Sequence, residues 1–310
     1  MKRQYRVRNW SEYTAGLKQR GSLIFWVTDE VLEQWLIQDK TGHRGASPTY
    51  SDLAIATVAT LKSLFHLAGR QAQGLTQSLF KLMQINLPVP DHSTVSRRLG
   101  TLSVSMPVQQ HTGPRHVVVD STGIKIYGEG EWKTRQHGVS KRRTWRKLHL
   151  GVDEACGEIL IAEVTTNDYR DSEILASLLD GIGDEVSQVS GDGADDTFEC
   201  HEVIAQRGAV AAIPPRRDAQ RSQPNENMPT HPRDQILHRI EQVGRKGWKQ
   251  ESGYHRRSLA ETMMFRVKVT FGGRVRSRIF DNQAVELFLQ CAALNRMIQV
   301  AKPDSYAIES

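Results

Sequence analysis

The fold is decided by the stretch HVVVDSTGIKIYG, residues 116–128. Its three consecutive valines, residues 117–119, predict a buried β-strand, because β-branched side chains suit a packed, pleated surface. Asp120 follows them directly and should lie at the C-terminal end of that strand, exposed at the edge of a sheet. Residues 121–123 predict a turn, and a second extended piece should follow. The segment therefore opens a domain that contains a sheet and carries a carboxylate at its edge.

Strands and helices alternate after this segment. Residues 146–166 predict a hairpin of two strands, with Cys156 and Gly157 in its turn. The elements expected after the hairpin are a helix at 171–182, a strand, tight turn and helix within 187–208, a strand at 210–216, and helices at 254–268 and 282–300. This order predicts an α/β fold with a mixed sheet flanked by helices, whose first three strands form an antiparallel meander.

An all-helical region is predicted before the sheet. Ser51 can cap its first helix, and Asp91 can cap a short polar helix that exposes Arg97 and Arg98. A helix, a turn and a short polar helix form the arrangement with which helix-turn-helix proteins enter a major groove. The alternative interpretation is a helical bundle with a polar surface helix.

The largest part of the predicted domain organisation is interrupted by a polar segment. Residues 216–253 are polar and basic, with one amphipathic piece, and they predict an insertion or long loop of the kind that is usually functional or mobile. The predicted parts are an N-terminal segment at 1–48, a helical DNA-binding region at 49–112, a catalytic domain at 113–300 that contains this insertion, and a tail at 301–310.

Charge and cysteine content restrict the class of protein. The 310 residues include 41 Lys and Arg against 35 Asp and Glu, and the net charge of +6 favours an anionic partner, nucleic acid first. Three widely spaced cysteines provide neither a disulfide framework nor a plain zinc site, which fits a reducing compartment. No secretory signal and no apolar run of about 18 residues is present, so a soluble, intracellular protein without a membrane partner is expected.

Three acidic residues stand in contexts that suit a metal site. Asp120 ends one predicted strand, and Asp192 lies between two glycines directly after another. If these strands are neighbours, the two carboxylates face each other at the end of the sheet, where open α/β sheets form their sites. Glu261 would reach in from the helix at 254–268. Carboxylates without Cys or paired His suit Mg²⁺ or Mn²⁺, and two such ions promote in-line phosphoryl displacement.

The helix that carries Glu261 presents further polar groups on the same side. At about 100° per residue, Tyr254, Arg257, Glu261 and Lys268 share one narrow face. Arg257 and Lys268 could hold the phosphates of a strand that is being cut, and Tyr254 could bind a phosphate or stack on a base.

A basic run fills residues 133–147, which hold seven cations and no acid. Trp145 lies among these cations, and Arg142, Arg143 and Lys147 are the candidate DNA contacts. Cations interleaved with tryptophan suit phosphate binding and base stacking. A solvated charged surface is the alternative explanation.

The spacing of four residues carries a resemblance to a known family. Tyr254, Arg257, Glu261 and Lys268 are separated by two, three and six residues. In this spacing, and in the segments VVVDSTG, GDGADDT, WRKLHLGVD and IPPR, the chain resembles bacterial transposases of the insertion-sequence "five" family, which belong to the Asp-Asp-Glu (DDE) class. One position departs from the pattern: Asp195 stands where the family commonly has an aromatic residue, which makes it an outside candidate for the site.

The resemblance implies a fold and an activity. The fold would be a ribonuclease-H-like catalytic core with Asp120, Asp192 and Glu261 as catalytic, metal-binding acids. The enzyme would bind terminal inverted repeats, hydrolyse the transposon end, and join the exposed 3′ hydroxyl to target DNA. Its partners would be double-stranded DNA at the ends and target, and further copies of itself, as a dimer or larger assembly on DNA. A bacterial, nucleoid-associated, cytoplasmic location would follow.

Two alternatives remain open at this point. A ribonuclease-H-like nuclease that cuts without joining would use the same carboxylates, although it would not need a helical end-recognition region. A non-catalytic DNA-binding regulator is the second alternative, and the three acids argue against it. A carboxylate pair for glycoside hydrolysis fits the basic charge poorly.

Overall fold

The computed structural model describes residues 4–38, 49–126, 145–222 and 230–308. Contacts between residues divide the chain into two compact units, each of which is described by itself. One unit contains residues 108–269 and 273–276, and the other contains residues 1–107, 270–272 and 277–310. The sequence instead predicted one domain over 113–300; the residues after 276 group with the N-terminal helices, and the predicted domain bounds stay a prediction.

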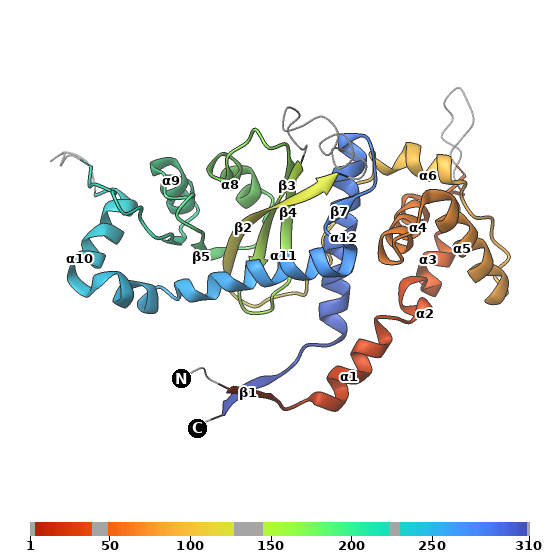
Figure 1. Cartoon of the computed structure of the whole chain (residues 1–310), viewed down its shortest axis with the longest axis horizontal. Helices are drawn as coiled ribbons and strands as arrows, with labels where there is room; N and C mark the ends of the chain where they lie inside the picture. Colours follow the sequence, from red (N-terminus) through yellow and green to blue (C-terminus); the bar gives the residue numbers. More distant parts are fainter. Residues whose placement is uncertain (1–3, 39–48, 127–144, 223–229, 309–310) are drawn as a thin grey trace, which may run out of the picture. The chain divides into compact units, whose positions relative to one another are not determined.

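The first unit is built on a mixed sheet (Figure 1), and within the described residues this sheet has six strands. Its strands lie in the order β4-β3-β2-β5-β6, and β7 pairs with the far end of β2. Neighbours β2, β3 and β4 are antiparallel, whereas β5 and β6 run parallel to β2. The strand bounds are β2 Arg115–Ile126, β3 Trp145–Asp153, β4 Ile159–Thr165, β5 Val186–Ser190, β6 Val210–Ala212 and β7 Arg274–Val275. The predicted antiparallel meander and mixed sheet are confirmed.

The strand that carries Asp120 is longer than predicted. β2 does not end at Asp120 but continues to Ile126, so the predicted turn at residues 121–123 is wrong. The physical reason is the pairing with β3, which runs without a break from Val117 opposite Asp153 to Lys125 opposite Trp145. Asp120 therefore lies in the middle of a hydrogen-bonded strand, and its backbone is fixed by the ladder on that side.

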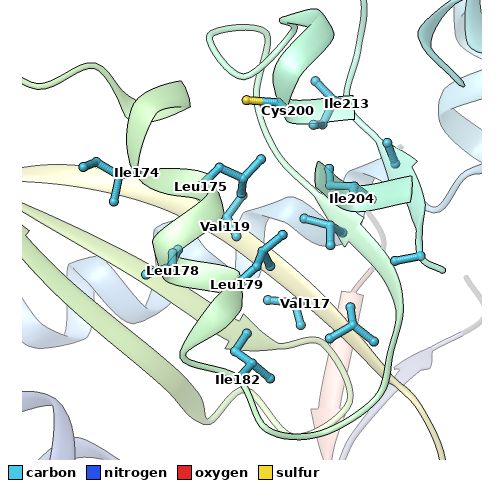
Figure 2. Close-up of a cluster of buried hydrophobic side chains, with 14 residues drawn as sticks. Val117, Val119, Ile174, Leu175, Leu178, Leu179, Ile182, Cys200, Ile204 and Ile213 are labelled. Carbon is cyan, nitrogen blue, oxygen red and sulfur yellow. The ribbon is translucent and has the colours of Figure 1, made fainter. Parts of the chain in front are cut away.

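One face of this sheet is covered by two helices, α8 Asp171–Asp180 and α9 Phe198–Gln206. Side chains of β2 at positions 117 and 119 join Leu175 and Leu179 of α8 and Ile204 of α9 in one buried apolar cluster (Figure 2). Because side chains alternate along a strand, Asp120 belongs to the opposite set of β2 side chains from this cluster. The core thus fixes the strand whose other side carries the acid.

The segment that opens with Tyr254 contains two helical elements where the sequence predicts one. Residues Tyr254–Arg257 form a 3₁₀ helix, η1, which follows Gly253 in the left-handed conformation at φ 65°. The α-helix α11 then runs Ser258–Phe271 and has buried apolar side chains at Met263, Met264 and Val267. Its prediction as a helix is confirmed, whereas the geometry of the first turn is tighter than that of an α-helix.

The insertion at 216–253 contains a long helix. α10 spans Pro232–Glu251 and bends at Gly244, whose φ of 74° is not helical. The amphipathic piece in this region predicts only part of that length. Among the described residues of the insertion, most belong to this helix, so a long loop is the wrong description of them.

The second unit is mostly helical. It contains the helices α1 Trp10–Gln19, α2 Leu23–Trp26, α3 Asp29–Glu33, α4 Asp52–Leu64, α5 Gly69–Leu82, α6 His92–Leu99 and α12 Phe280–Val300. Ser51 and Asp91 cap α4 and α6, because their side chains accept hydrogen bonds from the amides of Ala54 and Ser93. The segment predicted as a tail includes β8, Ser305–Ile308, which pairs antiparallel with β1, Gln4–Val7. Across the described ranges, none of the helices has the length and apolar character needed to cross a bilayer.

Candidate active site

Asp120 and Asp192 are brought level by the parallel pairing of two strands. The last pair between β2 and β5 joins Val118 to Ser190. Asp120 lies two residues after Val118 in β2, and Asp192 lies two residues after Ser190, where β5 ends. Both acids therefore lie just beyond the point where β5 stops pairing. The prediction of facing carboxylates depended on these two strands being neighbours, and β2 and β5 are neighbours. The site therefore lies beyond the carboxyl end of β5.

Glu261 and Arg257 complete this group. Arg257 lies on η1 and Glu261 lies on the first turn of α11. The Arg257 guanidinium is 3.4 Å from Asp120 Oδ2 and donates a hydrogen bond of 2.5 Å to Glu261 Oε1. One cation therefore links two of the three predicted acids, Asp120 and Glu261.

The three carboxylates interact electrostatically. Burial raises the pKa of Asp120 above its ordinary value, and the charges of Asp192 and Glu261 raise it further. The amide of Ser121, which donates to Asp120 Oδ1 at 2.8 Å, and the Arg257 guanidinium act in the opposite direction. Burial alone would lower the pKa of Arg257, but Tyr254 and the three carboxylates outweigh it and raise that pKa. The site thus concentrates negative charge around a single guanidinium.

The chemistry of these ligands fits a divalent cation. Asp120, Asp192 and Glu261 offer carboxylate oxygens alone, the donors that hard cations such as Mg²⁺ and Mn²⁺ prefer. Burial is the main cause of the raised pKa of Asp120, and the charges of Asp192 and Glu261 add to it; a bound cation would relieve that mutual repulsion. In the described part of the chain no three His, Cys, Asp or Glu side chains lie close enough to hold one ion, and Arg257 supplies the positive charge between Asp120 and Glu261.

Tyr254 and Lys268 lie on either side of this centre along the chain. In a 3₁₀ turn, residues three apart eclipse one another, and the Arg257 guanidinium carbon is 6.0 Å from the centre of the Tyr254 ring. Lys249, from the last turn of α10, places its ammonium 4.7 Å from the same ring. Lys268 donates a 2.6 Å hydrogen bond to Thr122 Oγ1, two residues beyond Asp120 on β2. Arg257 therefore contacts two of the acids, Tyr254 lies beside Arg257, and Lys268 contacts β2 close to Asp120 in sequence; the role of these three residues in binding DNA stays a prediction.

The tight turn that carries Asp192 holds two further aspartates. The Asp195 carboxylate accepts a hydrogen bond from the Asp192 amide at 3.2 Å, and Gly191 makes room for it, since a Cβ there would lie 2.5 Å from Asp195 Oδ2. Burial, followed by the charge of Asp192, raises the pKa of Asp195 to about 7. Asp196 does not cap the following helix: that cap is Thr197, whose Oγ1 accepts from the Cys200 amide at 3.2 Å.

A small cavity lies beside the acids. Its volume is about 20 Å³, room for roughly one water molecule. Asp120, Asp192 and Asp195 line it together with His149 and Asp171, two residues that reasoning from the sequence missed. No signal in the linear sequence connects these two positions with the acids, because β3 and α8 bring them there.

The basic run at 133–147 is described only at its end. Arg142 and Arg143 lie outside the described residues. Trp145 begins β3, and its ring lies 5.8 Å from the Lys125 ammonium. Lys147 donates to Asp171 Oδ1 at 3.1 Å and to the carbonyl of Tyr169 at 2.9 Å. The Lys147 ammonium is thus engaged within the protein, and its predicted DNA contact stays a prediction.

The two arginines predicted on the short helix α6 have different surroundings. Arg97 is exposed, and its guanidinium contacts the Thr94 hydroxyl of the same helix at 3.3 Å. Arg98 donates to the carbonyl of Tyr50 and to the carboxylate of Asp52. Arg97 is therefore available to a ligand, whereas Arg98 ties α6 to the start of α4.

Comparisons with known proteins identify a family. Two family models, each described as a transposase DDE domain, match the chain at residues 18–129 and at residues 111–296. The second match covers more than half of the chain. Among solved structures, a cryo-EM structure of the piggyBac transposase synaptic complex with hairpin DNA shares 11% identity, with 95% of this chain and 77% of that chain covered, at a TM-score of 0.39. A likeness at that score supports no argument, and the family matches alone identify the chain.

Proposed function

The chain belongs to the family of DDE-domain transposases, metal-dependent enzymes that cleave and transfer DNA, and from that premise we propose its reaction. It binds the terminal inverted repeats of its element, hydrolyses the transposon end, and joins the 3′ hydroxyl to target DNA. Membership in the insertion-sequence "five" family is part of this proposal, supported by the spacing of Tyr254, Arg257, Glu261 and Lys268.

A single observation carries the proposal for the site. The parallel register of β2 and β5 brings Asp120 level with Asp192, and Arg257 joins Asp120 to Glu261. These three acids are therefore the proposed catalytic and metal-binding residues. They would hold two Mg²⁺ or Mn²⁺ ions, whose chemistry in such a site would be to activate the attacking oxygen and stabilise the leaving oxygen of an in-line displacement.

The remaining residues of the site hold the DNA strand. Arg257 and Lys268 would bind phosphates at the transposon end, and Tyr254 would bind a phosphate or stack on a base. Since Arg257 already lies between Asp120 and Glu261, a phosphate that it binds would lie next to the acids. Hydrolysis and joining then proceed in the same place by successive displacements at phosphorus, with no covalent enzyme intermediate.

The test separates DNA binding from chemistry. Asp120→Asn, Asp192→Asn and Glu261→Gln keep the side-chain shapes but remove the charges that would hold a divalent cation. Each variant should fold and bind end DNA in Ca²⁺. The rates of nicking and joining should fall by at least about 100-fold, since replacing even a residue that only hydrogen-bonds to a metal ligand lowers metal affinity or activity 10–100-fold. The assay uses full-length protein and a labelled end oligonucleotide with Mg²⁺ or Mn²⁺.

Asp180→Asn is the matched control, because Asp180 lies in the same unit with its side chain 82% exposed. It should nick like the wild type. A Glu261→Gln variant that nicks at the normal rate would contradict the three-acid assignment. Wild-type protein that nicks the end but never joins it to a second duplex would identify a nuclease, and protein that only binds would identify a regulator.

A further inference from the structure

We propose that Arg233 is a positioning residue for the second acid: it clamps Asp196 and so fixes the turn from which Asp192 reaches the site. The inference rests on the proposed role of Asp192 and extends that role to the insertion, since Arg233 lies on the first turn of α10.

The clamp is a buried, two-pronged ion pair. Arg233 Nε donates to Asp196 Oδ1 at 2.8 Å and its Nη2 donates to Oδ2 at 2.9 Å, while the Asp196 side chain is 0% exposed. The amide of Arg216 donates to Oδ2 at 2.8 Å, and His201 Nε2 lies 3.3 Å from Oδ1. The Arg233 guanidinium also lies over the Phe198 ring at 4.9 Å. A planar, bidentate pair of this kind fixes direction as well as distance.

The clamp lies next to the residues that shape the Asp192 turn. Asp192 Oδ1 accepts from the Ala194 amide at 2.6 Å, and the Asp192 amide donates to Asp195 at 3.2 Å. The Thr197 amide then donates to the Asp195 carbonyl at 2.8 Å. Before the turn, β5 is fixed by the sheet. Within the turn, the Arg216 guanidinium donates to the carbonyls of Gly193 and Ala194 at 3.3 and 3.5 Å. After the turn, Arg233 anchors the Asp196 side chain to α10, so the clamp holds the far end of the turn.

The same helix also reaches the other side of the site. Arg233 belongs to the first turn of α10, and the last turn carries Trp248, which is buried with its ring 6.2 Å from that of Tyr254. Lys249, next to it, lies over Tyr254. At one end, α10 thus contacts the turn that carries the second acid, Asp192. At its other end it contacts Tyr254, which lies on the turn before the helix that carries the third acid, Glu261. An insertion in this arrangement is a support of the site.

The expected consequence of losing the clamp is a looser Asp192 with an intact DNA-binding surface. Small displacements of a ligand or a reacting group reduce rates strongly, and residues that hold metal ligands affect metal affinity by 10–100-fold when they are replaced. DNA affinity should change little, because Arg233 is buried and its donors are occupied within the protein.

The experiment compares Arg233→Gln with the wild type in full-length protein, with three measurements. Hydrogen exchange of the metal-free protein should show faster exchange of amides 192–195, by about tenfold or more. Mn²⁺ affinity without DNA, measured from the electron paramagnetic resonance signal of free Mn²⁺, should weaken about tenfold. End-DNA affinity in Ca²⁺ should stay within about twofold. Arg233→Lys, which restores the charge without the two prongs, should recover part of the Mn²⁺ affinity.

Arg207→Gln is the matched control for a purely structural arginine. Arg207 ends α9 in the same unit and donates to the carbonyls of Leu179 and Ile182, away from the Asp192 turn. It should lower the melting temperature without changing Mn²⁺ affinity or exchange at 192–195. If Arg233→Gln behaves like Arg207→Gln in both measurements, the positioning role is wrong.

A buried charge left unpaired can unfold a protein, so a second variant protects the test. The double variant Asp196→Asn with Arg233→Gln keeps a hydrogen-bonding pair without charge. If it folds and shows the weaker Mn²⁺ affinity, the proposal stands. If it binds Mn²⁺ like the wild type, or cannot fold at all, the pair serves folding alone and the proposal is overturned. Failure of the proposed function is a separate result: Asp192→Asn would then bind Mn²⁺ as tightly as the wild type.

Discussion

Three aspartates within five positions, at 192, 195 and 196, have three different environments. Asp192 is half-buried, and Asp195 is buried against the Asp192 amide, where burial and the charge of the Asp192 carboxylate raise the pKa of Asp195 to about 7. Asp196 is buried too, but hydrogen bonds from His201 and Arg233 outweigh burial and hold its pKa well below its ordinary range. The same side chain thus has opposite shifts depending on whether a cation or another carboxylate lies next to it.

His149 provides a residue-scale prediction of pH dependence. Its side chain is buried; burial outweighs the favourable charge of Asp171 and lowers its pKa from 6.5 to about 4. Between pH 6.5 and pH 4, His149 is therefore protonated in the unfolded chain but neutral in the folded chain. Its contribution to the free energy of unfolding is complete above pH 6.5 and is lost as the pH falls towards 4. Between pH 7 and pH 5, the free energy of unfolding should fall by about 2 kcal/mol from this residue.

Urea unfolding of metal-free protein at the two pH values, followed by tryptophan fluorescence, measures this difference. His149→Gln should remove about 2 kcal/mol of the change between pH 7 and pH 5, whatever its effect at pH 7. His255→Gln, at an exposed histidine, is the control and should leave the difference as in the wild type. An unchanged difference in His149→Gln would show that the buried imidazole is not the source.

At the scale of elements, the site depends on where helical geometry changes. Tyr254 and Arg257 lie on a 3₁₀ turn, in which residues three apart stack, and Glu261 lies one turn further along α11. The intervals between Tyr254, Arg257 and Glu261 keep Arg257 beside both of the other two, even though the first turn is not α-helical, and Lys268 contacts Thr122 of β2 further along the helix. A spacing of three or four residues survives such a change, because both helix types place those residues on one side.

Helix α6 gives a prediction that separates two neighbouring arginines. Arg97→Ala should weaken end-DNA affinity by about tenfold, since removing an arginine that binds DNA costs roughly 1–3 kcal/mol. Arg98→Ala should instead lower the melting temperature by about 2–4 °C, because Arg98 binds the Tyr50 carbonyl and Asp52. Gel shifts with end and random DNA, together with thermal melts, measure both effects.

Other contacts within the same unit hold α6 in place, so the Arg97→Ala variant should lose the side chain without loss of the helix. Asn282 of α12 donates to the carbonyl of Ser96 at 2.8 Å, so removal of the Arg97 side chain leaves the backbone supported. Normal DNA affinity in Arg97→Ala, combined with weak affinity in a fully folded Arg98→Ala, would reverse the assignment.

At the scale of the whole molecule, the net charge of +6 predicts a strong salt dependence of DNA affinity. Replacement of Arg142 and Arg143 by Ala should reduce the slope of log affinity against log salt by about 0.9 for each duplex phosphate that the variant no longer neutralises. Adding Lys147→Ala should change the slope less, because Lys147 is bound to Asp171 and Tyr169. Binding isotherms from about 50 to 200 mM salt measure the slopes, and slopes in both variants equal to that of the wild type would assign the basic run to a solvated surface.

Features that depend on neighbours along the chain could be predicted from the residues alone. The valine run before Asp120 fixed a buried strand, the caps at Ser51 and Asp91 fixed two helix starts, and the four-residue spacing around Glu261 fixed one polar face. The resemblance to DDE transposases was carried by that spacing and by short quoted segments, and the family models match the chain.

Which distant residues meet depends on the packing of whole elements and could not be predicted from the residues alone. Pairing with β3 carried β2 past Asp120, and the parallel register with β5 brought Asp192 level with it. Arg233 reaches Asp196 across 37 positions, and no periodicity in the sequence connects them. The physical reason is that strand register and buried ion pairs depend on how whole elements pack, and that packing is set by the apolar cores beneath them.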